Sequence, residues 1–403
     1  MSDPNGPGPS LMVHFSVMVD PRIERTRLHA LNDILVIAIC GFICGVDNWV
    51  ELEMFGEEKE PWFRQFLELP NGIPSHDTFG RVFAALEPEA FSRCFMSWMR
   101  AVAEATQGDI IAIDGKTLRH SFDVAAKKAA IHMVSAWSTH NSMVMGQVKT
   151  DEKSNEITAV PKLLELLRVE GCIVTLDAMG CQRDIAQQIV DKGGDYVISL
   201  KGNQGALHKE VERLFTEARE ESFETVPHSY EETLGKDHGR LEQRRYWITP
   251  NLDTIKRAER WPCLSSVGMV ESERTIGTET SREVRYFISS LPGDDAKKFG
   301  AAVRRHWEVE NSLHWVLDVA FREDESRIRK DNAPENVAML RHVALNLLKA
   351  DKTNKAGIQA RRKKAGWSEK YLAHLLGHGS SARDAIPLGA GRIGRLSCQP
   401  HRV

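Results

Sequence analysis

Two short apolar segments of this chain each end on an aspartate. Residues 110–114 read Ile-Ile-Ala-Ile-Asp and residues 172–177 read Cys-Ile-Val-Thr-Leu-Asp. Such runs predict buried strands, and an aspartate at the end of each projects its carboxylate from the edge of a sheet on a rigid base. A strand-end aspartate is also a common turn former. Neither Asp114 nor Asp177 therefore defines a site by itself.

A third carboxylate lies far downstream, in the helical run His-Trp-Glu-Val-Glu-Asn-Ser-Leu-His-Trp at 306–315. In a regular helix, side chains four positions apart share one face, so His306, Glu310, His314 and Asp318 form one polar stripe. Zinc binding by His306 and His314 is one alternative interpretation. A role in the core or in facing a phosphate is the more ordinary interpretation of such histidines. Other carboxylates compete with Glu310 for a place in a site: Glu308, Asp318, Glu323, Asp324 and Glu325.

Two strand-borne aspartates and one helix-borne glutamate are hard oxygen ligands, which suit Mg²⁺ or Mn²⁺ better than zinc. Two such ions, about 3.5–4 Å apart, activate the attacking oxygen and stabilise the leaving oxygen of a phosphodiester. In this hypothesis Asp114 bridges both ions, while Asp177 and Glu310 each hold one. The first functional hypothesis is thus a phosphodiester-cutting enzyme.

The order of predicted elements indicates the fold. Residues 22–105 look helical, and strands are predicted at 110–114, 131–138 and 142–149. A helix at 156–169, a strand at 172–177, a helix at 180–192 and a strand at 195–200 follow. Three sequential strands and then alternating helices and strands describe a mixed α/β (α+β) sheet, in the order of the ribonuclease H-like fold.

A charged helix at 205–222 and strands at 241–249, 264–272 and 282–290 follow, and they read as a largely antiparallel insertion before Glu310. We expect six parts: a disordered or extended N-terminus (1–19), a helical domain with possible DNA binding (20–106), the first part of the catalytic core (107–204), the β-rich insertion (205–294), the helical region completing the core (295–350) and a basic tail (351–403).

Charge is unevenly distributed along the 403 residues. The net charge is −3, yet residues 326–403 hold sixteen Lys and Arg against five Asp and Glu. This asymmetry indicates either a tail that contacts an anionic partner or a solvated basic tail. Arg361-Arg362-Lys363-Lys364 lies in this region and would contact a DNA backbone if the first interpretation holds.

The cysteines and the apolar runs favour a cytoplasmic protein without a membrane partner. The seven cysteines form no Cys-x-x-Cys pair, which fits reduced thiols and argues against a disulfide framework or zinc ribbon. The longest uncharged apolar run, residues 34–46, is too short to span a bilayer.

Several cations are candidates for contact with nucleic acid. Lys116 follows the first aspartate by two residues, and Lys201 follows the strand at 195–200. Arg240 lies in the run His-Gly-Arg-Leu-Glu-Gln-Arg-Arg at 238–245, where alternating charge indicates either a DNA backbone contact or the wet face of a sheet. Residues 71–83, with Ser75 as a helix cap, fit either a helix-turn-helix or a plain packing helix.

Long motifs of this chain resemble those of one family. They are Asp-Gly-Lys-Thr-Leu-Arg at 114–119, Leu-Asp-Ala at 176–178, Tyr-Val-Ile-Ser-Leu-Lys-Gly-Asn-Gln at 196–204, residues 306–324, and Gly-Ile-Pro-Ser-His-Asp-Thr-Phe-Gly-Arg-Val-Phe at 72–83. In this order they resemble the insertion-sequence transposases of the DDE class, in the ISAs family that includes the H-repeat-associated proteins. The resemblance runs from about Asp20 to about Leu348.

The resemblance implies a DNA transposase with a ribonuclease H-like domain and Asp114, Asp177 and Glu310 as its metal-binding triad. It implies endonuclease cleavage at terminal inverted repeats and strand transfer into target DNA, with two Mg²⁺ or Mn²⁺ ions and a homodimer on DNA. Water attacks the phosphodiester, and the freed 3′-hydroxyl then attacks target DNA. The alternatives are a catalytically silent DNA-binding remnant and a ribonuclease H-like nuclease without strand transfer.

One departure concerns the helix around Glu310. Related transposases place a Tyr, an Arg and a Lys there, and the corresponding positions hold Val303, His306 and Leu317. The residues of this helix that would contact phosphate are therefore not assigned by the resemblance. The available substitutes are Arg304, Arg305, Arg322 and His314, with His306 itself as a further candidate DNA contact.

Overall fold

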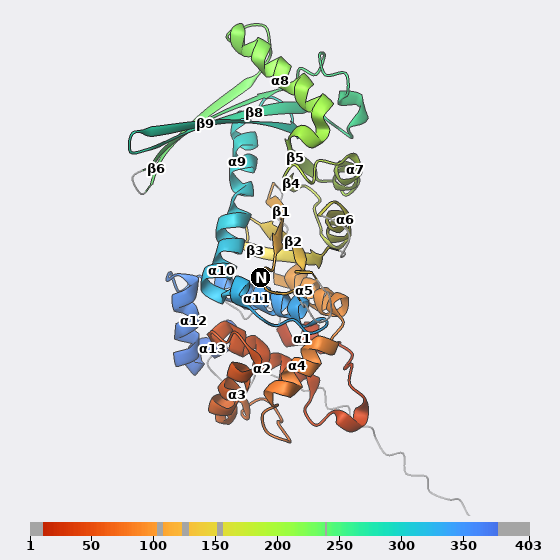
Figure 1. Cartoon of the computed structure of the whole chain (residues 1–403), viewed down its shortest axis with the longest axis vertical. Helices are drawn as coiled ribbons and strands as arrows, with labels where there is room; N and C mark the ends of the chain where they lie inside the picture. The colour runs from red at the N-terminus through yellow and green to blue at the C-terminus, as the bar shows by residue number, and fades with distance from the viewer. Residues whose placement is uncertain (1–10, 103–107, 123–128, 151–155, 238–239, 378–403) are drawn as a thin grey trace, which may run out of the picture.

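The structure is a computed structural model that describes residues 11–102, 108–122, 129–150, 156–237 and 240–377. The molecule is elongated, with a helical domain at one end, a sheet in the middle and a β-rich extension covered by a helix at the other end (Figure 1). The middle layer holds the two aspartates, Asp114 and Asp177.

A single nine-stranded sheet runs through the protein in the order β3-β2-β1-β4-β5-β9-β8-β7-β6. Its core strands are β1 (Ile110–Thr117), β2 (His132–Ser138), β3 (Met143–Lys149), β4 (Ile173–Leu176) and β5 (Asp195–Leu200). β1, β2 and β3 form an antiparallel meander, while β1, β4 and β5 are parallel. The parallel strands are connected through α6 (Glu156–Leu166) and α7 (Arg183–Asp191). The predicted ribonuclease H-like α/β fold is confirmed.

The β-rich insertion extends this same sheet. It contains α8 (Gly205–Glu220), β6 (Ser229–Asp237), β7 (Arg240–Thr249), β8 (Ser266–Ile276) and β9 (Glu279–Ser289). β9 pairs antiparallel with β5, from Val197↔Ser289 to Leu200↔Tyr286. The sequence did not predict β6, because most of its side chains are exposed and it lacks an alternating apolar pattern.

The helix α9 (Ala296–His306) crosses one face of the sheet, and α8 covers the other face of the extension (Figure 1). Phe299 of α9 packs directly on Gly268 of β8, where a Cβ atom would lie 2.3 Å from the ring. Only glycine permits this approach. The close packing fixes α9 on the sheet, and α9 leads directly into the helical segment that carries Glu310.

The helix α11 (Ala333–Ala350) joins the helical domain to the sheet. Its neighbours include α2 (Leu31–Cys44), α4 (His76–Ala85), α5 (Pro88–Val102) and β3. Asn336 donates to the carbonyls of Phe83 (2.8 Å) and Leu86 (3.0 Å). Asn346 accepts from the Val144 amide (3.0 Å) and donates to its carbonyl (2.8 Å), so it satisfies the backbone of the edge strand β3.

The N-terminal prediction needs a correction. We expected an extended or disordered chain to residue 19, but Leu11–Phe15 form the helix α1. Leu11 and Phe15 are buried, and the Phe15 ring lies 5.3 Å from that of Phe91, centroid to centroid. Apolar packing therefore orders this segment. Residues 1–10 of the same prediction lie outside the described residues.

The segment at 71–83 does not have the geometry of a helix-turn-helix. Residues 64–75 separate α3 (Trp49–Phe63) from α4, whereas that motif has a turn of about three or four residues. Ser75 caps α4 as predicted, because its side chain accepts a hydrogen bond from the Thr78 amide. Phe79, Val82 and Phe83 are buried, which is the arrangement of a packing helix.

Within the described residues, no single helix is long and apolar enough to cross a membrane. α2 and α3 meet the length and composition criteria only as a pair, and the pair is bent by 101°. The six cysteines that the structure describes are all free thiols. The seventh, at 398, lies outside the described residues.

Candidate metal centre

Parallel pairing of β1 and β4 brings the two aspartates to equivalent positions. The last register pair of this ladder is Ile113↔Leu176, and Asp114 and Asp177 are the next residues on the two strands. β4 ends at Leu176, but β1 continues to Thr117 because it still pairs with β2, with Asp114 opposite Ser135. The prediction that the first strand ends on Asp114 is therefore wrong, while its neighbour relation to Asp177 holds.

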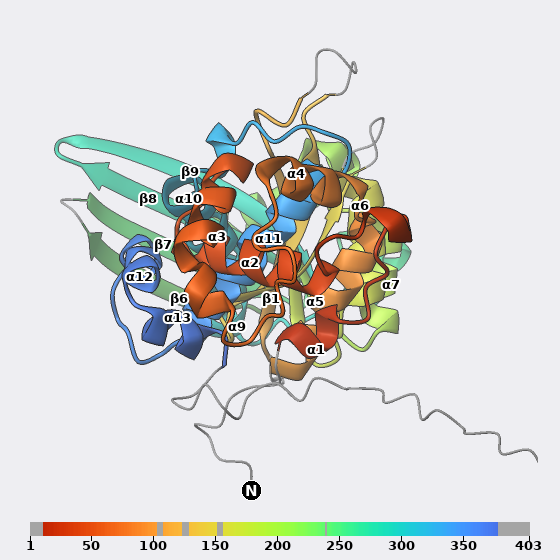
Figure 2. The same cartoon turned by 90° about the horizontal axis from the view of Figure 1, so that it is seen from below.

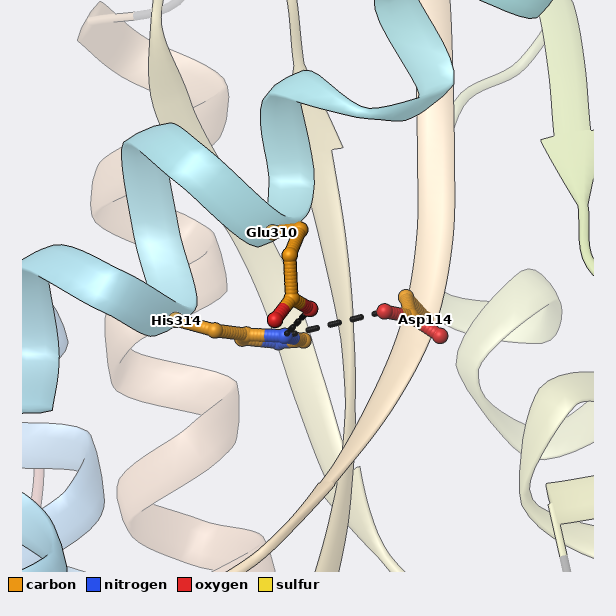
Figure 3. Close-up of side chains that lie close together, drawn as sticks. All are labelled: Asp114, Glu310 and His314. Atoms are coloured by element: carbon orange, nitrogen blue, oxygen red, sulfur yellow. Dashed lines mark hydrogen bonds and ion pairs between the residues drawn. The ribbon is translucent and has the colours of Figure 1, made fainter. Parts of the chain in front are cut away.

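Glu310 reaches Asp114 from the helical layer. α9 ends at His306, a π-helical turn spans Glu310–His314, and α10 (Trp315–Phe321) follows. The Nδ1 atom of His314 lies 3.3 Å from a carboxylate oxygen of Glu310 and 3.6 Å from one of Asp114. Figure 3 shows the imidazole between the two carboxylates. One ligand atom from each of these three residues lies within 4.8 Å of the others.

The predicted polar stripe is interrupted between His306, where α9 ends, and Glu310, where the π-helical turn begins. Glu310 and His314 remain neighbours, but His306 points elsewhere and its Nδ1 lies 2.9 Å from the Thr175 hydroxyl on β4. Asp318 forms an ion pair with Lys116. π-Helical turns inside helices are frequent at functional sites, and apolar periodicity does not reveal them.

Asp177 is close to Asp114 but outside that three-residue cluster. Its Oδ1 atom accepts hydrogen bonds from the amides of Met179 (2.8 Å) and Gly180 (3.2 Å). The loop that follows Asp177 is held by two residues of the sequence motif at 196–204. Gln204 donates to the Cys181 carbonyl (2.9 Å), and Asn203 donates to the Ala178 carbonyl (2.5 Å). The carboxylate of Asp177 thus has a fixed orientation beside β1.

Burial and mutual repulsion act on these acids. The pKa of Asp114 is raised to about 6, chiefly by burial and also by the charges of Glu156 and Asp177, while the charge of His314 opposes the shift. Burial also raises the pKa of Asp177. The hydrogen bond with His314 lowers the pKa of Glu310. A half-buried group of carboxylates that repel one another is stabilised by a bound cation.

Glu156 is a fourth acid that sequence reasoning missed. It begins α6, its Oε1 atom lies 2.8 Å from Nε2 of His132, and its charge raises the pKa values of both Asp114 and Asp177. A Cβ atom on Gly115 would lie 2.1 Å from the Glu156 carboxylate and 2.3 Å from His132. The glycine after Asp114 therefore makes room for this pair, which no local pattern indicates.

The two lysines that were predicted to contact phosphate, Lys116 and Lys201, differ in their surroundings. Lys116 forms an ion pair with Asp318 and lies 3.6 Å from Glu323 and 3.7 Å from Asp324. Its ammonium group is thus enclosed by carboxylates, which argues against the predicted phosphate contact. Lys201 is exposed, and its charge lowers the pKa of Asp177. Lys201 is therefore a cation beside the metal centre that remains open to a ligand.

The predicted arginines lie away from the carboxylates. Arg240 begins β7, at the projecting end of the β6–β7 hairpin, while residues 238–239 lie outside the described residues. Arg304 lies 3.5 Å from Glu242, and Arg322 pairs with Glu325 and lies 3.7 Å from Asp47. Arg305 is exposed, and the Tyr- and Lys-equivalent positions Val303 and Leu317 are buried.

The donor set fits a divalent cation. Asp114, Asp177 and Glu310 offer carboxylate oxygens from three separate segments, and His314 adds an imidazole nitrogen. Oxygen ligands of this kind hold Mg²⁺ or Mn²⁺. A ribonuclease H-like sheet with carboxylates at the ends of the β1–β4 ladder and on the covering helix defines the class of nucleases and transposases that process phosphodiesters.

Within that class, the chain belongs to the DDE transposase family. The family model described as "Transposase DDE domain" matches residues 105–347, and the model described as "DDE_Tnp_1-associated" matches residues 12–99. Membership implies DNA as a partner and dependence on a divalent metal ion. It also confirms the resemblance to insertion-sequence transposases of the H-repeat-associated kind.

Curated relatives agree with this assignment. The "H repeat-associated putative transposase YhhI" of Escherichia coli (strain K12) is 44% identical over 371 residues, covering 91% of this chain and 97% of the relative. The "Putative transposase YncI" of Escherichia coli O157:H7 is 43% identical over 378 residues, covering 91% and 94%. A shorter relative, the "Inactive transposase YbfQ" of Escherichia coli (strain K12), is 42% identical over 72 residues, covering 18% of this chain and 86% of the relative.

Proposed function

We propose that this protein is an active, metal-dependent DNA transposase with Asp114, Asp177 and Glu310 as its catalytic and metal-binding triad. The observation that carries the proposal is the position of Asp114, which neighbours Asp177 across the β1–β4 ladder and clusters with Glu310 of the π-helical turn. All three carboxylates are intact, which favours activity over a silent remnant.

The chain's own residues hold and orient the reacting groups. Asp114 neighbours Asp177 across the β1–β4 ladder and lies near Glu310 across His314, so these three carboxylates would hold the divalent ions. When bound, two divalent ions polarise the phosphodiester and stabilise charge on the attacking and leaving oxygens. Water attacks the phosphodiester at the element's end and releases a 3′-hydroxyl. That hydroxyl then attacks target DNA, without a covalent enzyme intermediate.

Lys201 is the cation best placed to position the scissile strand. It is exposed at the end of β5, beside Asp177, and its short loop is tied to the loop after β4 through Asn203 and Gln204. A lysine there contributes a point charge to a phosphate next to the metal centre.

A groove in the helical domain supports contact with duplex DNA. It has a volume of about 620 Å³ and lies between the first turns of α3 and α4 and the segment 327–330. The dipoles of both helices are positive at these ends, although Asn48 and Ser75 already accept from first-turn amides and Asp47 and Asp77 also line the groove. Exposed cations that line it are Arg81, Arg327 and Lys330.

The basic cluster at 361–364 contributes less than its sequence suggests. It lies in α12 (Ile358–Trp367), where Arg361 donates to the carbonyls of Leu348 (2.7 Å) and Asp351 (2.9 Å). Arg362 is buried. Only Lys363 and Lys364 are exposed, so at most half of this cluster is available for a DNA backbone.

We further propose that the protein acts as a homodimer on paired terminal inverted repeats, within the bacterial cytoplasm.

One experiment tests the central proposal. Purified protein is incubated with Mn²⁺ or Mg²⁺ and a duplex carrying the element's terminal repeats, next to Asp114→Asn. We expect metal-dependent nicking and joining by the wild type, and neither by the variant. End binding without nicking would identify a silent remnant, and nicking without joining would identify a plain nuclease.

A further inference from the structure

His314 occupies a position that the three carboxylates alone do not explain. Its side chain is 5% exposed, and its Nδ1 atom faces the carboxylates of Glu310 and Asp114 (Figure 3). The other ring nitrogen, Nε2, is buried on the opposite side, where no described residue forms a hydrogen bond with it. The imidazole thus separates the carboxylate cluster from the interior.

A small polar cavity lies behind this ring. Its volume is about 10 Å³, and its lining includes Lys116, Gln147, Glu323 and His342 besides His314. Gln147, Glu323 and His342 are each at most 3% exposed. Among the described residues, no hydrogen-bond partner exists for either terminal atom of the Gln147 amide, for Oε1 of Glu323 or for Nδ1 of His342. The residues that carry these atoms line, together with His314, a space of about one water molecule.

The cavity determines which nitrogen of His314 carries a proton. Through one water in this cavity, the Gln147 carbonyl oxygen and the Glu323 carboxylate can accept a hydrogen bond that originates from a proton on Nε2. The Nδ1 atom of His342, which has no hydrogen-bond partner among the described residues, is a further polar atom on this side of the ring. In the absence of a cation, Nδ1–H donates to Glu310 (3.3 Å). A metal ion at this position would displace that proton, and with the remaining proton on Nε2 the lone pair of Nδ1 would face the ion. Metal-binding histidines are oriented in the same way by groups behind the ring.

We propose that His314 is a nitrogen ligand of the metal ion held by Asp114 and Glu310, and that this centre therefore prefers Mn²⁺ to Mg²⁺. The inference rests on the proposed metal-dependent function and specifies the ion. Mg²⁺ binds oxygen ligands and retains its waters, whereas an imidazole donor suits transition ions. Gln147 is a positioning residue, because it acts on the metal only through the His314 ring.

Pulsed electron paramagnetic resonance of the full-length chain with Mn²⁺ tests this directly. Coupling of Mn²⁺ to ¹⁴N is expected in the wild type, to be replaced by ¹⁵N coupling when histidine is ¹⁵N-labelled, and to be lost in His314→Ala. His306→Asn is the matched control, because His306 is a nearby imidazole whose Nδ1 atom contacts the Thr175 hydroxyl. The coupling of Mn²⁺ to ¹⁴N is expected to persist in this variant. Titration is expected to show Mn²⁺ affinity at least about tenfold lower in His314→Ala and about tenfold lower in Gln147→Leu.

The outcomes separate this inference from the proposed function. Mn²⁺ binding that is lost in Asp114→Asn but shows no nitrogen coupling in the wild type would overturn the ligand role of His314 and leave the transposase proposal intact. Equal affinity of the wild type for Mn²⁺ and Mg²⁺ would overturn the preference. The wild-type spectrum requires no variant to fold, and the cleavage assay above decides the proposed function independently.

Discussion

Asp114 and Asp177 are the first residues beyond the last register pair of the parallel β1–β4 ladder, Ile113↔Leu176. Neighbouring parallel strands therefore position two carboxylates side by side. Glu310, 133 residues beyond Asp177, completes the group from the layer that α9 starts. The intervening insertion lengthens the sheet, so it supports α9 instead of forming a separate unit.

The metal centre destabilises the fold when no metal is bound. Burial raises the pKa of Asp114 to about 6, from an ordinary 3.8. The folded protein therefore holds this proton more tightly than the unfolded chain, and stability present below the unfolded pKa is lost as pH rises through the folded pKa. Without metal, Asp114→Asn is expected to be about 2 kcal/mol more stable than the wild type at about pH 8, with no advantage near pH 4.

Equilibrium denaturation across this pH range measures the effect. Asp253→Asn, at an exposed aspartate of the insertion, is the control and is expected to change stability by less than about 0.5 kcal/mol. If the advantage of Asp114→Asn were the same at both pH values, the carboxylate would not be the titrating cause.

Arg362 is predicted to hold α12 in place. It is 5% exposed, donates to the carbonyls of Phe42 (2.9 Å) and Ala320, and lies over the Phe321 ring. Arg362→Ala leaves two buried carbonyls without a donor and is expected to cost about 2–4 kcal/mol in denaturant unfolding. The adjacent exposed Lys363→Ala is expected to be neutral. Equal effects of the two changes would contradict a structural role for Arg362.

The groove between α3, α4 and the segment 327–330 is predicted to contact phosphates. The double change Arg81→Ala and Arg327→Ala is expected to reduce the slope of log affinity against log salt by about 2, because each phosphate contact contributes about 0.9. Arg93→Ala, at an exposed residue of α5 outside the groove, is the control. Fluorescence anisotropy with duplex DNA measures both, and an unchanged slope in the double variant would remove the groove from the DNA-binding surface.

Strand and helix patterns predicted the ribonuclease H-like sheet, because its apolar strands are buried on both faces. The placement of Asp114 and Asp177 followed from those strands. Glu310 could not be selected from its acidic neighbours by pattern alone, and the family resemblance selected it. The strand β6 was missed because an exposed strand has no apolar alternation to detect.

Contacts between segments distant in the sequence could not be predicted. Lys116 looked like a phosphate ligand because it follows Asp114, but the acids that enclose it come from about 200 positions later, as in its pair with Asp318. His314 lies in the π-helical turn beside the carboxylates, whereas His306, at the end of α9, contacts Thr175. Such outcomes depend on tertiary packing, which a period of 3.6 residues does not encode.

Cleavage and strand transfer by Glu310→Gln and Glu308→Gln test the central claim most directly. Both glutamates lie on the same helical segment, and the two changes are isosteric and remove one charge each. The predicted result is loss of metal-dependent nicking and joining, by at least about a hundredfold, in Glu310→Gln, with activity retained in Glu308→Gln. Full activity of Glu310→Gln on terminal-repeat DNA would contradict the assignment of this metal centre.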